Sequence, residues 1–376
     1  MLRLAEAADG YLARIRLPGG LIGAGQMRVL ARLAGELGDG RVELTSRGNV
    51  QLRALAAGDG GPLTDELARA GLLPSLSHER VRNVLASPLA GLDGGTDLDG
   101  GTDLTGIVRA LDAGLCVRPR LAELSGRFLF AVDDGRGDVA GLGADVVAYV
   151  RADGAVVNGL AVDGAAAQGR ARDDAVAAVM LACAEAFLDE AAVQGGTAWR
   201  VADLAAGDER VRAAVAARLR LAAAPQVPTG SAAAVRPVGM AGAGGTAAVL
   251  LAPLGRLNAA QLTWLAERVT GRPARVTPWR SVVLPDLADA AGVLRDAARL
   301  GFGVDATSPW LRVTACAGRP GCASALADVQ ADAAGFAARW PDRIVHVSGC
   351  ARHCGRPAAT EIDVTATTLG YQVAGV

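Results

Sequence analysis

Residues 11–37 read YLARIRLPGGLIGAGQMRVLARLAGEL, and residues 247–271 read AAVLLAPLGRLNAAQLTWLAERVTG. Each copy contains a strand-like run, a turn that begins with proline, and an amphipathic helix. A second strand follows each helix, within 41–55 in the first copy and within 273–287 in the second. A half-unit of this size is too small to fold well alone. The weak repeat therefore predicts that the two copies pair into one pseudo-symmetric domain.

The helices of the two copies are recognised by the spacing of their apolar residues. A spacing of three and four positions gives each helix one apolar stripe. The stripes are formed by Met27, Leu30, Ala31, Ala34 and Leu37 in the first copy, and by Leu262, Leu265, Ala266 and Val269 in the second. Asn258 is expected to cap the second helix. Arg47 and Arg280 are expected at matching places after the two helices.

Between the copies the sequence predicts a longer α/β region. Helices are expected over 104–114 and 171–190, and strands over 127–134 and 145–162. Asp153-Gly154 is a typical hairpin turn within the second of these strand segments.

Two stretches interrupt this pattern. Residues 91–103 form a Gly/Asp-rich loop, and 226–244, rich in Ala, Pro and Gly, is the best linker candidate. A short final unit follows the second copy and carries four of the six cysteines.

The composition is that of a folded protein and does not indicate nucleic acid or a membrane as partner. Apolar residues make up 51% and charged residues 20% of the 376, and the formal net charge is −1. This balance is too apolar for a disordered chain and argues against nucleic acid or a membrane surface as partner. All 38 basic residues are arginines, so a mechanism that needs lysine is excluded. No stretch resembles a signal peptide or a membrane span, and we expect a cytoplasmic protein with reduced thiols.

The final unit contains a cysteine pattern typical of an iron–sulfur site. CAGRPGC places five residues between Cys316 and Cys322, and HVSGCARHC places three between Cys350 and Cys354. The second pair stands one helical turn apart, so both sulfurs are expected to face one point. Glycine and proline in the first loop let the backbone wrap closely around a bulky inorganic core. Four thiolates are the usual ligands of a 4Fe–4S cluster.

The alternatives for these four cysteines are a zinc site or four unrelated thiols. Structural zinc usually has two to four residues between paired ligands, so a gap of five fits poorly. Cys116 and Cys183 stand alone and are expected to be ordinary buried residues. The three histidines, His78, His346 and His353, show no facial-triad spacing for a non-haem iron. We expect them at the surface or beside a site.

Arginines alternate on two predicted strands, so that each strand carries a polar face. The first face has Arg14 and Arg16, opposite Ala13, Ile15 and Leu17. The second has Arg47, Asn49, Gln51 and Arg53, opposite Val50 and Leu52. Arg82 supplies a further guanidinium. Guanidinium groups bind carboxylates in bidentate fashion, so such faces suit a polycarboxylate ligand. A solvated strand face is the alternative, and the residues alone leave both open.

These motifs together resemble the sulfite and nitrite reductase superfamily over nearly the whole chain. The pattern C-x5-C followed by SGC-x3-C, with Arg-Pro after it, carries the resemblance, as do RIRLPGG, ELTSRGNVQLR and RVRNVLASPLAG. Within the superfamily, the stretches SPWLRVTACAGRPGCASALADVQADA, TPWRSVVLPDL and HVSGCARHC are most similar to the precorrin-3B synthase branch.

The resemblance implies an α+β fold with pseudo-twofold symmetry. Two ferredoxin-like half-domains pair with each other, and two mixed α/β units complete the molecule. The implied bounds are 1–65 and 245–290 for the half-domains, 66–225 and 295–376 for the α/β units, and 226–244 for the linker. The last unit would bind the cluster.

The resemblance also implies an activity and the residues that serve it. It implies an oxygen-dependent monooxygenase that hydroxylates precorrin-3A at ring carbon 20 and closes a gamma-lactone. The partners are a polycarboxylate tetrapyrrole, molecular oxygen and an external electron donor. A 4Fe–4S cluster and an additional non-haem iron are the implied cofactors. The implied tetrapyrrole contacts are Arg14, Arg16, Arg47, Asn49, Gln51, Arg53, Arg82 and Arg127.

Two other functions stay open. A siroheme-dependent sulfite or nitrite reductase is one, but Arg127 and Leu129 occupy the places of two catalytic lysines of sulfite reductases. Arginine scarcely loses its proton and leucine carries none, which weakens this interpretation. The other is a non-catalytic tetrapyrrole-binding protein with a structural cluster. No residue is assigned a catalytic role.

Overall fold

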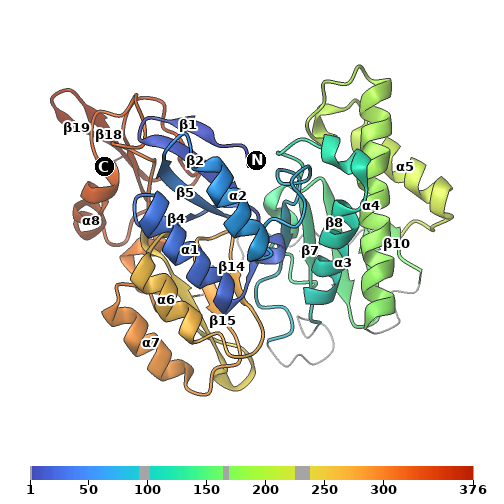
Figure 1. Ribbon diagram of the computed structural model, residues 1–376, viewed down its shortest axis with the longest axis horizontal. Coiled ribbons are helices and arrows are strands. Elements are labelled where there is room, and N and C mark those ends of the chain that lie inside the picture. The colour runs from blue at the N-terminus through green and yellow to red at the C-terminus, as the bar shows by residue number, and fades with distance from the viewer. Residues whose placement is uncertain (1, 93–101, 164–168, 225–237, 376) are drawn as a thin grey trace.

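The computed structural model describes residues 2–92, 102–163, 169–224 and 238–375. It contains four β-sheets with helices packed on them, which confirms the expected α+β class (Figure 1). Most of the predicted Gly/Asp-rich loop and of the predicted linker lies outside the described residues. The last part of the predicted linker contains β11 (Gly239–Ala241).

Each half-domain is a five-stranded sheet that takes one strand from the other copy. The first sheet has the order β1 (Ala5–Ala7), β2 (Gly10–Ile15), β5 (Val50–Leu55), β4 (Arg41–Leu44), β13 (Arg256–Asn258). The second has the order β11, β12 (Ala247–Leu251), β15 (Ser281–Leu284), β14 (Ala274–Val276), β3 (Leu21–Ile22). Because β13 pairs with β4 and β3 pairs with β14, neither sheet is complete without the other copy.

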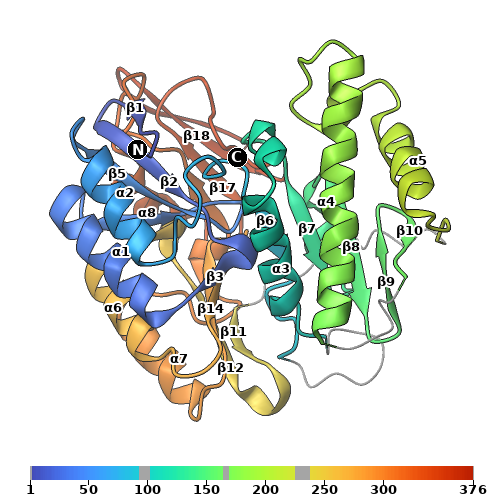
Figure 2. The ribbon, with the colours of Figure 1, turned by 45° about the vertical axis from the view of Figure 1, so that its right-hand side comes forward.

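The helices of the repeat pack together on these sheets. Helices α1 (Ala24–Leu37) and α6 (Ala259–Glu267) lie side by side, with α2 (Gly60–Arg69) and α7 (Ala290–Arg299) outside them (Figures 1 and 2). One continuous apolar core joins both copies through the predicted stripe residues, such as Met27, Leu30, Leu262 and Leu265. Val269 lies beyond the end of α6.

A matching pair of glutamines shows how closely the two copies agree. The backbone N–H of Gly23 donates to Gln26 Oε1, and that of Asn258 to Gln261 Oε1, both at 3.0 Å. Gln26 Nε2 donates to the carbonyl of Ala70 at 3.1 Å, and Gln261 Nε2 to that of Leu300 at 2.9 Å. Both carbonyls belong to the residue that ends the next helix. Asn258 caps α6 as predicted, accepting from the Gln261 N–H at 2.8 Å.

The residue that matches Arg47 is Trp279, so the predicted match of Arg47 with Arg280 is wrong by one position. The segment after each helix is a hairpin of two strands, and the turns begin at Thr45 and Thr277. Gly48 N–H donates to the Thr45 carbonyl, and Arg280 N–H to the Thr277 carbonyl, both at 3.1 Å. Gly48 and Arg280 also share a left-handed backbone, with φ of 63° and 61°.

The two α/β units repeat a second pattern. One sheet has the order β10 (Leu160–Ala161), β9 (Gly154–Val157), β8 (Val146–Arg151), β7 (Phe130–Asp133), β6 (Val84–Ala86). The other has the order β16 (Val313–Ala315), β17 (Val345–Ser348), β18 (Ile362–Thr367), β19 (Gly370–Ala374). In both, three parallel strands are followed by an antiparallel one. Asp153-Gly154 forms the predicted hairpin turn, because Arg151 pairs with Gly154.

Helices cover one face of each of these sheets. Helices α3 (Thr105–Cys116) and α4 (Arg170–Val193) cover the first sheet, and α5 (Gly207–Leu219) packs on α4 (Figure 2). Helix α8 (Val329–Arg339) covers the second. Helices α3 and α4 agree with the predictions over 104–114 and 171–190, since each prediction falls short of the observed ends by three residues at most.

Candidate functional site

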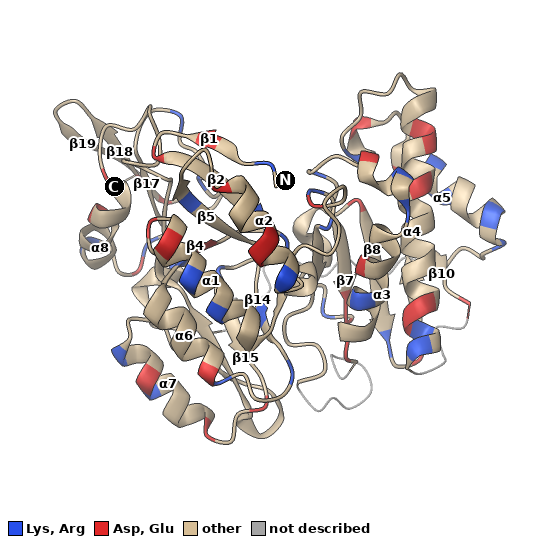
Figure 3. Ribbon diagram, in the orientation of Figure 1, with Lys and Arg blue, Asp and Glu red and all other residues tan. Residues whose placement is uncertain are grey.

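A cavity of about 610 Å³ lies where the first half-domain meets the first α/β unit. Six arginines and one glutamate are among its lining residues: Arg3, Arg14, Arg16, Arg47, Arg80, Arg127 and Glu79. None of the six arginines has a carboxylate partner within 4.0 Å among the described residues. The outer helices differ, because α7, for example, carries both signs of charge (Figure 3). The cavity therefore carries an excess of positive charge.

Strand β2 places Arg14 and Arg16 on the face opposite its buried residues, as the alternation predicts. Ala13, Ile15 and Leu17 are buried in the core, and Arg14 and Arg16 face the cavity. Val50 and Leu52 are likewise buried. Arg47 precedes β5, lines the cavity and donates through Nη1 to the Gly126 carbonyl at 2.9 Å.

Burial makes this positive charge costly. Burial lowers the pKa of Arg16 to about 10; Glu79 raises it, and the neighbouring Arg14 and Arg47 lower it further. Burial also lowers the pKa of Arg47, with Arg200 contributing repulsion. Crowded guanidinium groups repel one another, so an anionic ligand would relieve the repulsion and gain charge-assisted hydrogen bonds.

The remaining predicted contacts differ in position. Asn49 lines the cavity but is buried, accepting from the Leu17 N–H at 2.8 Å and donating to Asn83 Oδ1 at 3.2 Å. Gln51 donates to the carboxylate of Glu43. Three predicted contacts do not line this cavity, namely Gln51, Arg53 and Arg82.

Arg82 and Arg53 are buried, and each is paired with a carboxylate. The Arg82 Nε and Nη2 atoms donate to the Asp112 carboxylate at 2.6 and 2.7 Å. Arg53 donates to both carboxylate oxygens of Asp9 at 3.0 Å and, through Nη2, to the Gly321 carbonyl at 2.8 Å. Since Gly321 precedes Cys322, Arg53 fastens the first cysteine loop to the first half-domain.

A smaller groove of about 210 Å³ leads from the arginine cavity toward the second cysteine loop. Ser46 lines both the cavity and the groove. Gly355 and Pro357, which follow Cys354, form part of the groove wall, as does Trp279. The groove therefore brings the arginine surface and the Cys354 loop to a common space.

The cysteine loops follow the ends of β16 and β17. The N–H of Cys316 donates to the Val347 carbonyl at 3.0 Å, and the N–H of Gly349 donates to Cys316 Sγ at 3.1 Å. Cys350 and Cys354 lie in a series of turns, with His353 at φ 48° between them. The predicted helical turn is therefore wrong, because glycine and proline around this loop do not continue a helix.

The four thiols are not arranged as the ligands of a single zinc ion. With Zn–S bonds of about 2.3 Å, tetrahedral zinc places its sulfur ligands about 3.8 Å apart. No three of the four thiols, all of which are described, lie within 4.8 Å of one another. A four-iron cluster separates its thiolates further. The N–H donated to Cys316 Sγ also suits a thiolate ligand.

Two buried polar atoms beside these loops have no partner among the described residues, His346 Nε2 and Ser348 Oγ. Ser348 directly precedes the second loop. An unpaired buried polar atom costs free energy, so a group absent from the protein chain is expected to satisfy it. His346 Nδ1 is paired with Thr314 Oγ1 at 2.8 Å. His346 and His78 are buried rather than exposed; His78 contacts Ser75 and the Arg118 carbonyl.

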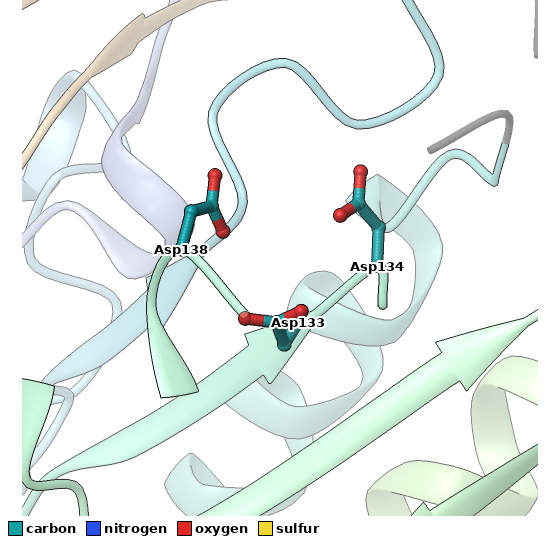
Figure 4. A group of neighbouring side chains, drawn as sticks. All are labelled: Asp133, Asp134 and Asp138. Atoms are coloured by element: carbon teal, nitrogen blue, oxygen red, sulfur yellow. The ribbon is translucent and has the colours of Figure 1, made fainter. Parts of the chain in front are cut away.

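Among the described residues, one group has three metal-type ligands within 4.8 Å, namely Asp133, Asp134 and Asp138 at the end of β7 (Figure 4). Asp133 accepts from the N–H groups of Gly135, Gly137, Val139 and Ala140 at 2.8 to 3.1 Å. Asp134 is paired with Arg136, and Asp138 accepts from Ser87 Oγ at 2.6 Å. Through these contacts the three carboxylates hold the loop in place, which explains why they lie close together.

Some lining residues were not singled out from the sequence. Arg3, Glu79 and Arg80 line the cavity, and Trp199 stands beside it against Arg127. Arg80 lies in RVRNV two positions before the predicted Arg82, so the alternation of a strand would have placed both on one face. Trp199 follows a Gly-Gly turn, and no local pattern indicates its position. Within the described residues, no helix is long and apolar enough to cross a membrane.

The chain is similar to proteins of one superfamily. A model of the nitrite/sulfite reductase ferredoxin-like half domain matches residues 4–70. A precorrin-3B synthase from Sinorhizobium sp is 27% identical over 384 residues, covering 97% of this chain and 79% of that protein. A ferredoxin–nitrite reductase from Leptolyngbya laminosa is 38% identical over 85 residues, which cover 22% of this chain and 17% of that protein.

A solved structure extends this similarity to the fold. The NirA protein of Mycobacterium tuberculosis superposes with a TM-score of 0.75 at 20% identity, covering 96% of this chain and 73% of that one. The chain therefore has the fold of that protein, and its sequence is similar to nitrite and sulfite reductases within the first half-domain and to a precorrin-3B synthase over nearly its whole length.

Proposed function

We propose that this chain is an oxygen-dependent monooxygenase of the precorrin-3B synthase type. It hydroxylates precorrin-3A at ring carbon 20, with closure of a gamma-lactone, in cobalamin biosynthesis. The observation that carries the proposal is the cavity lined by six arginines that have no carboxylate partner within the described residues, next to the groove that reaches the Cys354 loop. The similarity to a precorrin-3B synthase over 97% of the chain supports the choice of substrate.

The arginine cavity binds and orients the macrocycle. Precorrin-3A carries carboxylates around its rim, and Arg14, Arg16 and Arg47 offer donors from one wall. Each charge-assisted pair contributes about 1.5–3 kcal/mol. Several pairs at different positions define one orientation, which restricts the reaction to one ring carbon.

Cys316, Cys322, Cys350 and Cys354 would hold a 4Fe–4S cluster. When bound, the cluster supplies electrons one at a time from an external donor to the oxygen chemistry. The chain contributes the Gly349 N–H at Cys316 Sγ and the Arg53 contact to Gly321. A non-haem iron remains part of the proposal without assigned ligands.

The siroheme-dependent reductase is the second candidate, favoured by the partial match to ferredoxin–nitrite reductases. Two residues weigh against it. Leu129 is buried in a small apolar cluster and offers no proton, and Arg127 packs over Trp199. Reduction of sulfite or nitrite needs proton delivery at a compact site, which these side chains do not supply.

The deciding experiment is an assay under controlled oxygen. Protein purified anaerobically is mixed with precorrin-3A, a reductant and ¹⁸O₂, and the product is examined by mass spectrometry. We expect one labelled oxygen atom per product and a brown, iron–sulfur absorption spectrum. An intense haem-type band with sulfite or nitrite turnover would identify a reductase instead. Tight binding of precorrin-3A without turnover, given a working donor, would identify a carrier.

A further inference from the structure

A second cavity, of about 600 Å³, adjoins the arginine cavity and has not been assigned a role. The two share Arg80, Gly126 and Arg127 on their walls. The second cavity continues over helix α4, where Phe187, Leu188 and Ala191 provide an apolar wall, and Glu123 lies on its rim. It therefore combines a cationic edge with an apolar face.

Trp199 stands at the junction of the two cavities. Its ring lies under the Arg127 guanidinium, 4.5 Å from the ring centroid, and its side chain is 52% exposed. An exposed tryptophan leaves a large apolar surface in water, which is more often found at binding sites than elsewhere. In this pair the guanidinium of Arg127 lines both cavities, and the ring of Trp199 adds apolar surface to the second.

The segment that carries Trp199 is firmly attached to the fold. The N–H of Trp199 donates to Asp203 Oδ2 at 2.9 Å. The next residue, Arg200, donates through Nε to Asp145 Oδ2 at 2.7 Å. Asp145 also accepts from the Leu129 N–H at 2.9 Å, so the turn is tied to the strand that leads from Arg127. Such anchoring presents the ring at a defined position and lowers the entropy lost on binding.

We propose that the second cavity is a subsite for one edge of the tetrapyrrole, with Trp199 packed against the macrocycle and Arg127 paired with a carboxylate arm. This inference rests on the proposed function, because it assumes a polycarboxylate tetrapyrrole in the arginine cavity. A ring with an apolar face and a carboxylate rim matches a wall that is apolar over α4 and cationic at Arg80 and Arg127. A ligand small enough for the first cavity alone has no contact with Trp199.

The test uses uroporphyrin, a stable tetrapyrrole with eight carboxylates, and measures binding by quenching of tryptophan fluorescence and by calorimetry. In Trp199→Leu we expect a dissociation constant roughly three- to tenfold higher, as loss of an aromatic contact costs about 0.5–1.5 kcal/mol. Trp199→Phe should recover most of the affinity. The matched control is Trp264→Phe, because Trp264 forms a similar pair with Arg268 at 3.8 Å on α6, away from both cavities.

The outcomes separate this inference from the proposed function. Unchanged uroporphyrin affinity in Trp199→Leu, with weaker binding in Arg16→Gln, would overturn the subsite and leave the proposed function standing. Unchanged turnover of precorrin-3A by Trp199→Leu would count against the subsite in the same way. If the wild-type protein binds neither uroporphyrin nor precorrin-3A, the proposed function itself is refuted.

Discussion

Ser87 and Cys316 occupy equivalent positions in the two α/β units. Each follows the first strand of its sheet, and each N–H donates at 3.0 Å to the middle strand, to Val132 or Val347. Ser87 Oγ accepts from the Asp134 N–H at 3.2 Å, and Cys316 Sγ accepts from the Gly349 N–H at 3.1 Å. The same backbone frame therefore presents a hydroxyl in one half and a thiol in the other.

A second equivalent pair, Asp133 and Ser348, shows how the loops of the two α/β units differ. Asp133 ends β7, and its carboxylate fills the loop by accepting four backbone N–H groups. Ser348 ends β17 at the matching place, and its hydroxyl is buried without a partner among the described residues. A carboxylate accepts the backbone N–H groups of the first loop, whereas the matching hydroxyl beside the cysteines of the second loop has no partner among the described residues.

Replacing a proposed cluster ligand should remove cofactor and activity together. We expect Cys354→Ser to lose the cluster, because a neutral hydroxyl is a poor ligand for iron–sulfur iron. Iron and sulfide analysis and electron paramagnetic resonance measure the loss, and Cys116→Ser is the control. An intact cluster in Cys354→Ser would contradict the ligand assignment.

Ionic strength should govern tetrapyrrole binding. We expect Arg16→Gln to weaken uroporphyrin binding by about tenfold or more, since a charge-assisted hydrogen bond contributes about 1.5–3 kcal/mol. Affinity of the wild-type protein should fall as salt rises, because salt screens the crowded guanidinium groups. Titrations at two salt concentrations measure both effects. Arg170→Gln, on an exposed residue, should bind like the wild type; an equal loss there would argue against a specific site.

Arg53 should act on stability rather than on substrate affinity. Arg53→Met leaves the buried Asp9 carboxylate without a partner, and breaking such a pair costs about 3–5 kcal/mol. Urea unfolding measures the loss, and iron content should fall because the first cysteine loop is released. The double variant Arg53→Met with Asp9→Asn should recover part of the stability. Normal stability with weaker tetrapyrrole binding would instead support the substrate contact predicted from the sequence.

The two matching glutamines should contribute similarly to stability. Gln26→Ala and Gln261→Ala each remove one N-terminal cap contact and one bond to the end of the next helix. We expect each to cost about 1–3 kcal/mol, as a typical hydrogen bond contributes about 1 kcal/mol. Chemical denaturation measures the cost. A cost confined to one copy would show that the pseudo-symmetric contacts are energetically unequal.

Asp138 should make stability depend on pH between about 4 and 6. Burial raises the pKa of Asp138 to about 6 from an ordinary value of 3.8. The unfolded chain releases this proton at the lower pH, so the contribution of Asp138 is fully present below about pH 4. It is lost as pH rises to about 6 and stays at the lower level above.

The variant Asp138→Asn should lack this dependence while keeping an acceptor for Ser87. Its stability relative to the wild type should therefore increase from pH 4.5 to 7.5, as measured by urea midpoints. The exposed Asp163→Asn is the control. A difference between variant and wild type that is constant with pH would refute the prediction.

Local patterns were sufficient to predict several helices and strands and to select candidate site residues. Periodicity placed the apolar stripes of α1 and α6, and strand alternation placed Arg14 and Arg16 on the face opposite Ile15. Cysteine spacing indicated the cluster candidates. The physical reason is that the periodicity of a helix or a strand relates residues only a few positions apart. A short segment of sequence is therefore enough to reveal it.

Contacts between distant segments required the folded molecule. Arg53 shares the polar face of β5 with Gln51, yet its guanidinium meets Gly321, 268 residues away, and Asp9. The exchange of β3 and β13, the place of Trp199 beside Arg127, and the burial of His346 likewise have no local signal. Each depends on which surfaces meet when several elements pack at once, and packing joins residues by shape and charge without regard to their separation along the chain.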